Sequence, residues 1–117
     1  QKPVGVLAVG SDLLISDQDQ NQILRAPIAA AGSASSLAQI DAPDLLSAGP
    51  AGALFTGGPS GSVRRVQADG TVADFAGGFL QVRGVAWDSK NGRLFVAEHD
   101  PDPNDGLDNA LHILPVD

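Results

Sequence analysis

The chain has 117 residues, the size of one domain, and 43% of them are hydrophobic, while only 4% are aromatic. Its core must therefore be built mainly from Val, Leu, Ile and Ala. The formal net charge of −7 provides no phosphate-binding field, so we expect no nucleic-acid partner. Disulfides and thiolate metal sites are excluded because there is no cysteine, and no apolar run has the length of a membrane-spanning helix, so we also expect no membrane partner.

Residues 3–40 have the pattern of four short strands separated by turns. The apolar run 6–9 ends in turn-forming residues, and the runs 13–15 and 23–25 follow it. Each run is too short for a stable helix and is bounded by residues that break helices, which favours strands. Residues 36–40 alternate between apolar and polar side chains and complete the set.

The outline of this unit returns twice, at a spacing close to forty residues. The segment 14–17 aligns with 54–57, and 54–57 aligns in turn with 95–98. A period near forty that is built from short strands is typical of β-propeller blades, and an evenly spaced β-sandwich is the alternative. We therefore predict a single all-β unit of three propeller blades, at about residues 3–40, 41–77 and 78–117.

The third blade is predicted to lack its outer strand. After a long acidic loop the sequence offers a single strand, residues 110–116, so the third blade has three strands and the first two have four. A propeller needs at least four blades to close a ring, and three alone would expose apolar blade faces and strand edges. We expect this chain to be the C-terminal half of a six-bladed propeller that another chain or a second copy completes.

The blade pattern resembles a known family. The first unit resembles an NHL-type blade and is similar to blades of the gluconolactonase and senescence-marker-protein group. The residues that carry this resemblance in the first unit are Pro3, Gly5, Asp17, Asn21, Ile23 and Arg25. In the third unit they are Gly84, Trp87, Asp88, Asn91, Gly92 and residues 95–98. The resemblance covers nearly the whole chain and implies a propeller fold, but propellers of this kind have many different activities.

Candidate site residues gather on one face of the expected propeller. The loops that lead into the innermost strands share this face with the loops between the second and third strands of each blade. The positions before the innermost strands hold Val4, Asp44 and Arg83, and the other loops hold Asp17, Asp19, Gly57, Glu98 and His99. Our candidates on the channel face are Asp44, Arg83, Asp17, Glu98 and His99.

Two functions fit this set of candidates. In the group that the first unit resembles, metal-dependent lactonases carry Asp, Asn or Glu just before each channel-lining strand. Of the three equivalent residues in this chain, only Asp44 matches that pattern. Val4 cannot bind a metal, and Arg83 would repel one. Asp44 and Arg83 suit a small polar or anionic ligand equally well, or they pair with each other. We therefore predict a binding scaffold, and the alternative is a lactonase-like, metal-dependent hydrolase whose site is shared with the remaining blades.

The acidic loop is a candidate calcium site. It carries the oxygen-bearing side chains of Asp100, Asp102, Asn104, Asp105 and Asp108. Alternating carboxylates beside a glycine suit Ca²⁺, which prefers hard oxygen ligands on a tight turn. An ordinary solvated surface loop is the alternative.

The remaining signals are weaker. His99 and His112 are the only histidines, and beside Glu98 they suit zinc binding or acid–base work, or else they are ordinary polar positions. Thirteen Asp with few Lys suggest a bacterial protein that is exported to the periplasm or the extracellular space.

Overall fold

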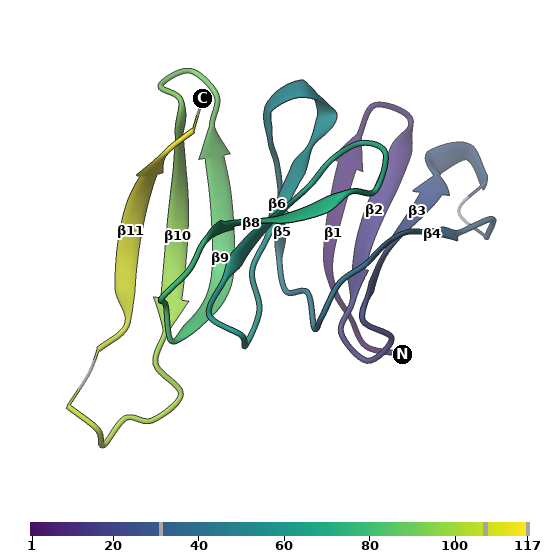
Figure 1. Cartoon of the computed structure of the whole chain (residues 1–117). Helices are drawn as coiled ribbons and strands as arrows, with labels where there is room; N and C mark the ends of the chain where they lie inside the picture. Colours follow the sequence, from purple (N-terminus) through teal and green to yellow (C-terminus); the bar gives the residue numbers. More distant parts are fainter. Residues whose placement is uncertain (31, 107, 117) are drawn as a thin grey trace.

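The computed structural model describes residues 1–30, 32–106 and 108–116. Within them, eleven strands form three antiparallel sheets, and no α-helix is present (Figure 1). The first sheet contains β1 (Pro3–Val9), β2 (Asp12–Asp17), β3 (Gln22–Pro27) and β4 (Ser35–Gln39). The second contains β5 (Leu46–Ala48), β6 (Leu54–Thr56), β7 (Val63–Val66) and β8 (Val72–Ala76). The third contains β9 (Gln81–Asp88), β10 (Arg93–His99) and β11 (Ala110–Pro115). Sheets of four, four and three strands confirm the prediction made from the repeats.

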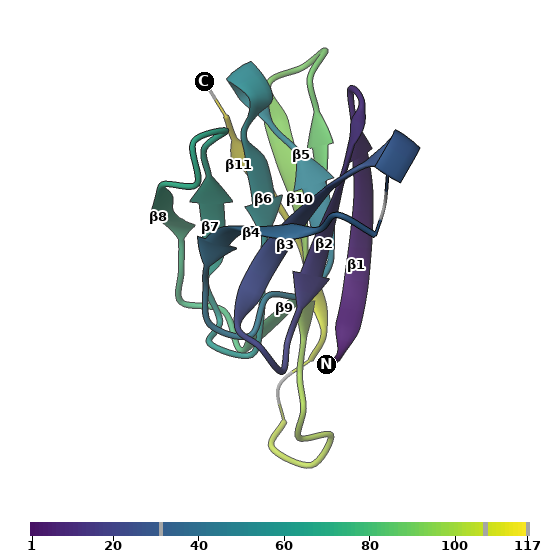
Figure 2. The same cartoon turned by 90° about the vertical axis from the view of Figure 1, so that its right-hand side faces the viewer.

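Within each sheet, strands that are consecutive in the chain pair with each other, so each sheet is a simple meander. Two short 3₁₀ turns, η1 (Ile28–Ala30) and η2 (Pro50–Gly52), interrupt the connections. The innermost strands β1, β5 and β9 contact one another in that order, and the sheets stack face to face. In the view of Figure 2 the first sheet lies nearest the viewer, with the other two behind it. In the described part of the chain, no helix is long and apolar enough to cross a membrane.

The hydrophobic core lies between the sheets, in two separate clusters. The first cluster joins the first two sheets, where Leu14 and Ile23 pack with Leu54 and Val66, all nearly or fully buried. Strand alternation explains which residues of β2 enter this cluster, because every second residue of the strand points to the same face of the sheet. Since the two faces of the second sheet both pack against apolar neighbours, its β6 is buried along its whole length.

The second cluster joins the second and third sheets. Phe55 of β6 packs with Val82 of β9 and Leu94 of β10, and all three are fully buried. Trp87 lies against this cluster, and its backbone N–H donates to Ser47 Oγ of the second sheet at 2.9 Å. Trp87 therefore packs between the second and third blades.

A glycine-rich loop brings the second and third sheets very close together. It spans residues 57–61, between β6 and β7, and the backbone N–H of Val82 donates to Gly58 O at 3.0 Å. A side chain at Gly57 would collide with the side chain and backbone of Val82. Gly61 has φ of +78° and likewise has no room for a Cβ beside the backbone of Phe79. The loop therefore needs glycine for close approach between blades.

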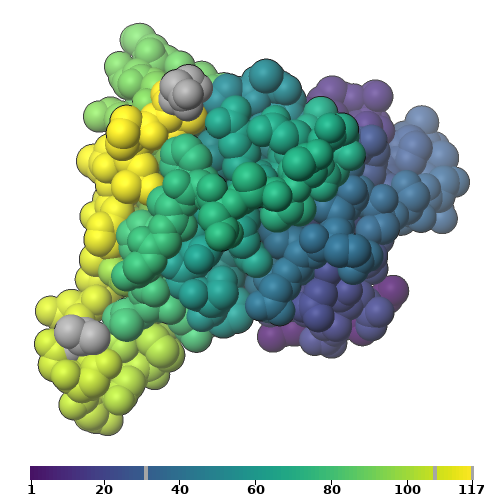
Figure 3. All heavy atoms as spheres, in the orientation of Figure 1, coloured from purple at the N-terminus to yellow at the C-terminus, as the bar shows by residue number. Residues whose placement is uncertain are grey.

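The two end sheets each leave an apolar face exposed. On the first sheet, Val6 is 67% exposed and lies beside Ile15, facing away from the second sheet. On the third sheet, Leu111 is 67% and Ile113 55% exposed, and Leu111 lies beside Phe95. Figure 3 shows β11, coloured yellow, along one end of the molecule. These faces correspond to the surfaces that neighbouring blades cover elsewhere in the chain.

Candidate functional site

A polar cavity opens where the three innermost strands begin. Its volume is about 240 Å³, and its lining comes from all three sheets. The lining residues are Lys2, Gln18, Asp44, Gly58, Pro59, Gln81 and Arg83. Two of the predicted candidates, Asp44 and Arg83, thus lie close together. The reason is that the innermost strands β5 and β9 both begin at this end of the molecule. We call this cavity the channel-mouth cavity.

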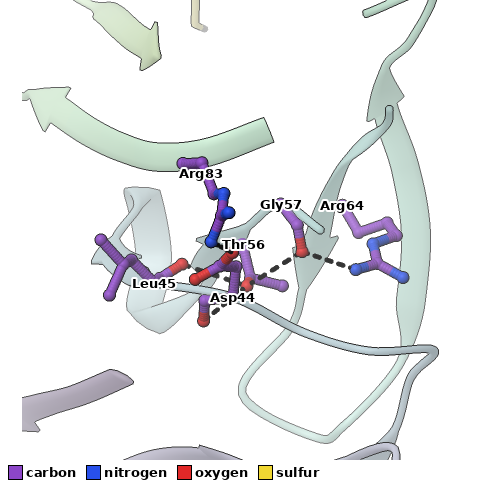
Figure 4. Close-up of polar contacts among 6 residues, drawn as sticks. All are labelled: Asp44, Leu45, Thr56, Gly57, Arg64 and Arg83. Atoms are coloured by element: carbon purple, nitrogen blue, oxygen red, sulfur yellow. Dashed lines mark hydrogen bonds and ion pairs between the residues drawn. The ribbon is translucent and has the colours of Figure 1, made fainter. Parts of the chain in front are cut away.

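Asp44 and Arg83 face each other across this cavity (Figure 4). Arg83 Nη1 lies 3.8 Å from Asp44 Oδ2, with 58% of the Arg83 side chain and 10% of the Asp44 side chain exposed. A guanidinium has five N–H donors, and a separation of 3.8 Å is too long for a direct hydrogen bond. The pair is therefore loose, and Arg83 keeps donors that can reach another group.

The backbone around Asp44 is held firmly by the end of β6. The Asp44 N–H donates to Gly57 O at 3.2 Å. The hydroxyl of Thr56, which is fully buried, lies 3.1 Å from Leu45 O and 3.3 Å from Asp44 O. A hydroxyl has one hydrogen to donate, so these carbonyls share it. Asp44 therefore reaches the cavity from a fixed backbone, although its own carboxylate pairs only loosely.

Arg64 of β7 also holds the backbone near Asp44 in place. The sequence pattern did not identify this residue. This side chain is only 6% exposed, and its Nη1 donates to Asp41 O at 2.7 Å. Its Nη2 donates to Gly57 O at 2.6 Å (Figure 4). Burial lowers the pKa of Arg64, while the charges of Asp41 and Asp74 act in the opposite direction. Arg64 therefore ties the segment before Asp44 to the end of β6.

Asp17 lies next to Gln18 of the cavity lining, but its carboxylate holds the local turn. Asp17 Oδ1 accepts hydrogen bonds from the Lys2 N–H at 3.0 Å and the Gln20 N–H at 3.2 Å, and the residue is 2% exposed. The hydrogen bond from the Lys2 backbone is the main reason why the pKa of Asp17 lies below its ordinary value. Asp17 thus positions the residues beside it.

Glu98 and His99 do not line the channel-mouth cavity. Glu98 Oε1 lies 2.9 Å from His112 Nε2, and Glu98 Oε2 accepts the Leu80 N–H at 2.7 Å. The ring of Phe79 lies 4.9 Å from the ring of His112. His99 ends β10 opposite Gln81. Glu98 and His112 therefore fasten the segment before β9 to the third sheet.

The Glu98 contacts predict a pH dependence of stability. The hydrogen bond from His112 and then that from Leu80 hold the pKa of Glu98 below its usual value of 4.5. Because the folded pKa is the lower one, ionised Glu98 stabilises the fold above about pH 4.5, and this stabilisation is lost as the pH falls through the folded value. We expect Glu98→Gln to lower the urea midpoint at pH 6, and this difference from the wild type to shrink at pH 3.

Asp102, an exposed residue of the acidic loop, provides the matched control for that measurement. Asp102→Asn also removes one carboxylate, but it leaves the His112 and Leu80 contacts in place. A wild-type and a Glu98→Gln protein whose midpoints differ equally at pH 6 and pH 3 would contradict the prediction.

Asp100 and Asp102 of the predicted calcium loop each use one carboxylate oxygen in a local turn. Asp100 Oδ1 accepts the Asp102 N–H at 2.8 Å, and Asp102 Oδ1 accepts the Asn104 N–H at 3.0 Å. The Asp100 N–H donates to Asn109 Oδ1 at 2.7 Å. Among the described residues, no three His, Cys, Asp or Glu side chains converge to hold a metal ion. Calcium binding in this loop, through Asp100, Asp102, Asn104, Asp105 and Asp108, stays a prediction.

The channel-mouth cavity does not fit a metal with the residues that this chain supplies. Of the three predicted positions, Asp44, a carboxylate before β5, and Arg83, a cation in β9, line the cavity, while the apolar Val4 of β1 does not. A divalent cation needs several oxygen ligands, and the neighbouring guanidinium would repel it. The residues of this chain alone therefore do not form a metal site in this cavity.

Comparison with solved structures identifies the fold. The chain matches a calcium-binding protein, regucalcin, of Agrobacterium tumefaciens with a TM-score of 0.82 at 17% identity, over 98% of this chain and 46% of the other. The chain folds as blades of a β-propeller. It also matches a gluconolactonase of Xanthomonas campestris (TM-score 0.72, 15% identity, 98% of this chain and 43% of the other). A chain of a nidogen–laminin complex matches with a TM-score of 0.73 at 16% identity, over 93% of this chain and 47% of the other.

These matches describe the propeller fold and leave the family open. No family model and no curated protein matches the chain. The chain spans less than half the length of each of the three propellers named above. A calcium-binding protein and a gluconolactonase share this blade arrangement, so the activity has to be argued from the residues of this chain.

Proposed function

We propose that these blades belong to a closed β-propeller, completed by another chain or a second copy, which acts as a binding scaffold. Its ligand face is the channel-mouth cavity, and its ligand is a small polar molecule. The observation that carries this proposal is the pair of apolar blade faces left exposed at the two ends of the stack, beside Val6 on the first sheet and Leu111 on the third.

Ring closure accounts for both exposed faces at once. Inside the chain, each sheet-to-sheet contact buries a full apolar cluster, so an uncovered blade face exposes side chains that elsewhere are buried. Monomeric soluble proteins rarely leave such patches open. Because three blades cover less than half of each propeller matched above, a ring of about six blades is the arrangement we favour.

The proposal predicts that charges on the end faces prevent assembly. Burying a Val or Leu side chain contributes about 1.5–3 kcal/mol, and a charge in the same place adds a desolvation cost. We expect Leu111→Asp and Val6→Asp each to shift the protein from a closed ring to separate parts. Light scattering coupled to size exclusion measures this shift as a loss of mass.

Val72 provides the control for the assembly experiment. It is 38% exposed on β8, the outer strand of the middle blade, and lies away from both end faces. Val72→Asp should leave the mass unchanged. A chain of 11.9 kDa that stays monomeric and folded, with no difference among the three variants, would overturn the proposal.

The similarity to a gluconolactonase keeps a lactonase-like hydrolase as the second candidate. In that case the remaining blades would have to supply the other metal ligands. Among the residues of this chain at the mouth, only Asp44 suits a metal. Metal analysis of the assembled protein, followed by a lactone-hydrolysis assay, separates the two candidates. Bound metal together with turnover would favour the hydrolase over the scaffold.

A further inference from the structure

The channel-mouth cavity combines two cationic residues with a single acid. Lys2 and Arg83 line it together with Asp44. The whole chain has seven Lys and Arg against fourteen acids, so two cations around one cavity are a local reversal of its charge. Asp17 is adjacent to the lining residue Gln18 and keeps its negative charge, but its Oδ1 accepts the Lys2 and Gln20 N–H groups and it does not line the cavity. The side chains that line the cavity therefore carry one more positive than negative charge.

From this arrangement we infer that the channel-mouth cavity binds a small monoanionic carboxylate that carries hydroxyl groups, with Arg83 as the carboxylate anchor. This inference names the ligand class of the proposed scaffold and rests on that proposed function. It differs from a metal site, which the same residues do not fit.

The loose Asp44–Arg83 pair supports a carboxylate at this position. Arginine binds carboxylates through two parallel N–H···O bonds, which need a separation near 2.8 Å. Asp44 lies 3.8 Å from Arg83 Nη1, and its backbone is tied to β6, so Asp44 does not satisfy the guanidinium. With 58% of its side chain exposed, Arg83 can turn its remaining donors toward a ligand in the cavity.

The other polar residues of the lining suit hydroxyl groups. Gln18 and Gln81 each have an amide that can both donate and accept hydrogen bonds, and the Asp44 carboxylate accepts them. Asp44 also disfavours a dianion such as phosphate, because it reduces the surplus to one positive charge. A volume of about 240 Å³ has room for a molecule the size of a single sugar ring.

D-glucuronate and D-glucose form a matched pair of probes, because they differ by one carboxylate. Isothermal titration of the assembled, full-length protein should give a dissociation constant for glucuronate at least about tenfold lower than for glucose, as expected for one charge-assisted contact. Arg83→Gln should weaken glucuronate binding about tenfold or more and leave glucose binding unchanged. Inorganic phosphate should bind more weakly than glucuronate.

Lys90→Gln is the control for overall charge. Lys90 is exposed in the turn between β9 and β10, at the opposite end of β9 from the cavity, and its replacement changes the net charge by the same amount. It should leave glucuronate binding unchanged. Equal affinities for glucuronate and glucose, or equal losses in the two variants, would overturn the inference. The mass measurement reports ring closure separately, so a failure of the scaffold proposal is distinguishable from a failure of this one.

Discussion

Gly57→Ala is expected to lower the free energy of unfolding by about 3 kcal/mol, the upper part of the range for overpacking. A Cβ at this position would collide with the Val82 side chain and lie 2.7 Å from Val82 O. Relief would require β9 to move away from β6, and Phe55, Val82 and Leu94 pack tightly at that junction. Urea unfolding followed by circular dichroism measures the loss.

Gly32→Ala is the matched control. An added Cβ at Gly32 meets no atom within 4 Å, so the same chemical change carries no packing cost there. We expect its free energy of unfolding to stay within about 0.5 kcal/mol of the wild-type value, because alanine also restricts the unfolded chain. Equal effects of the two substitutions would show that the second and third blades separate at no cost, which would contradict the packing described here.

The repeat pattern was enough to predict the sheets and part of the site. Short apolar runs bounded by turns gave the eleven strands, and the period of forty placed Asp44 and Arg83 at equivalent strand starts, where the structure brings them within 3.8 Å. The same period aligns Gln18 with Gly58, and both line the cavity. The repeat pattern could therefore also have predicted Gln18 as a residue of the cavity.

Other features depend on contacts between blades, which a repeat pattern does not encode. Gly57 aligns with Asp17 and Glu98, yet its role is to let β9 approach, and only the packed structure shows this. In the sequence, Lys2 has the pattern of a terminal tail, yet it lines the channel-mouth cavity. Glu98 contacts His112 and does not line the cavity. Arg64 sits in an apolar strand pattern beside Arg65, and nothing in the sequence tells which of the two is buried.

Arg64→Met is expected to cost about 3 kcal/mol, because two hydrogen bonds from a charged donor are lost and each contributes about 1.5–3 kcal/mol. Methionine fills a similar volume, but it leaves Asp41 O and Gly57 O without the donors that now lie 2.7 Å and 2.6 Å away. Gly57 O also accepts the Asp44 N–H, so the loss should loosen the Asp44 backbone as well. Urea unfolding measures the first effect, and weaker glucuronate binding in the assembled protein reports the second.

Arg65→Met separates this role from the general loss of an arginine on β7. Successive strand residues point to opposite faces, and the Arg65 guanidinium lies 5.8 Å from the Phe55 ring centre, a cation–π contact of about 0.5–1 kcal/mol. Its replacement should therefore cost clearly less than that of Arg64. Arg64→Lys should fall between the two, because an ammonium keeps the charge but lacks the planar fork that reaches both carbonyls. If Arg64→Lys were as stable as the wild type, charge alone would suffice, and the paired contacts to Asp41 and Gly57 would not be what holds the mouth together.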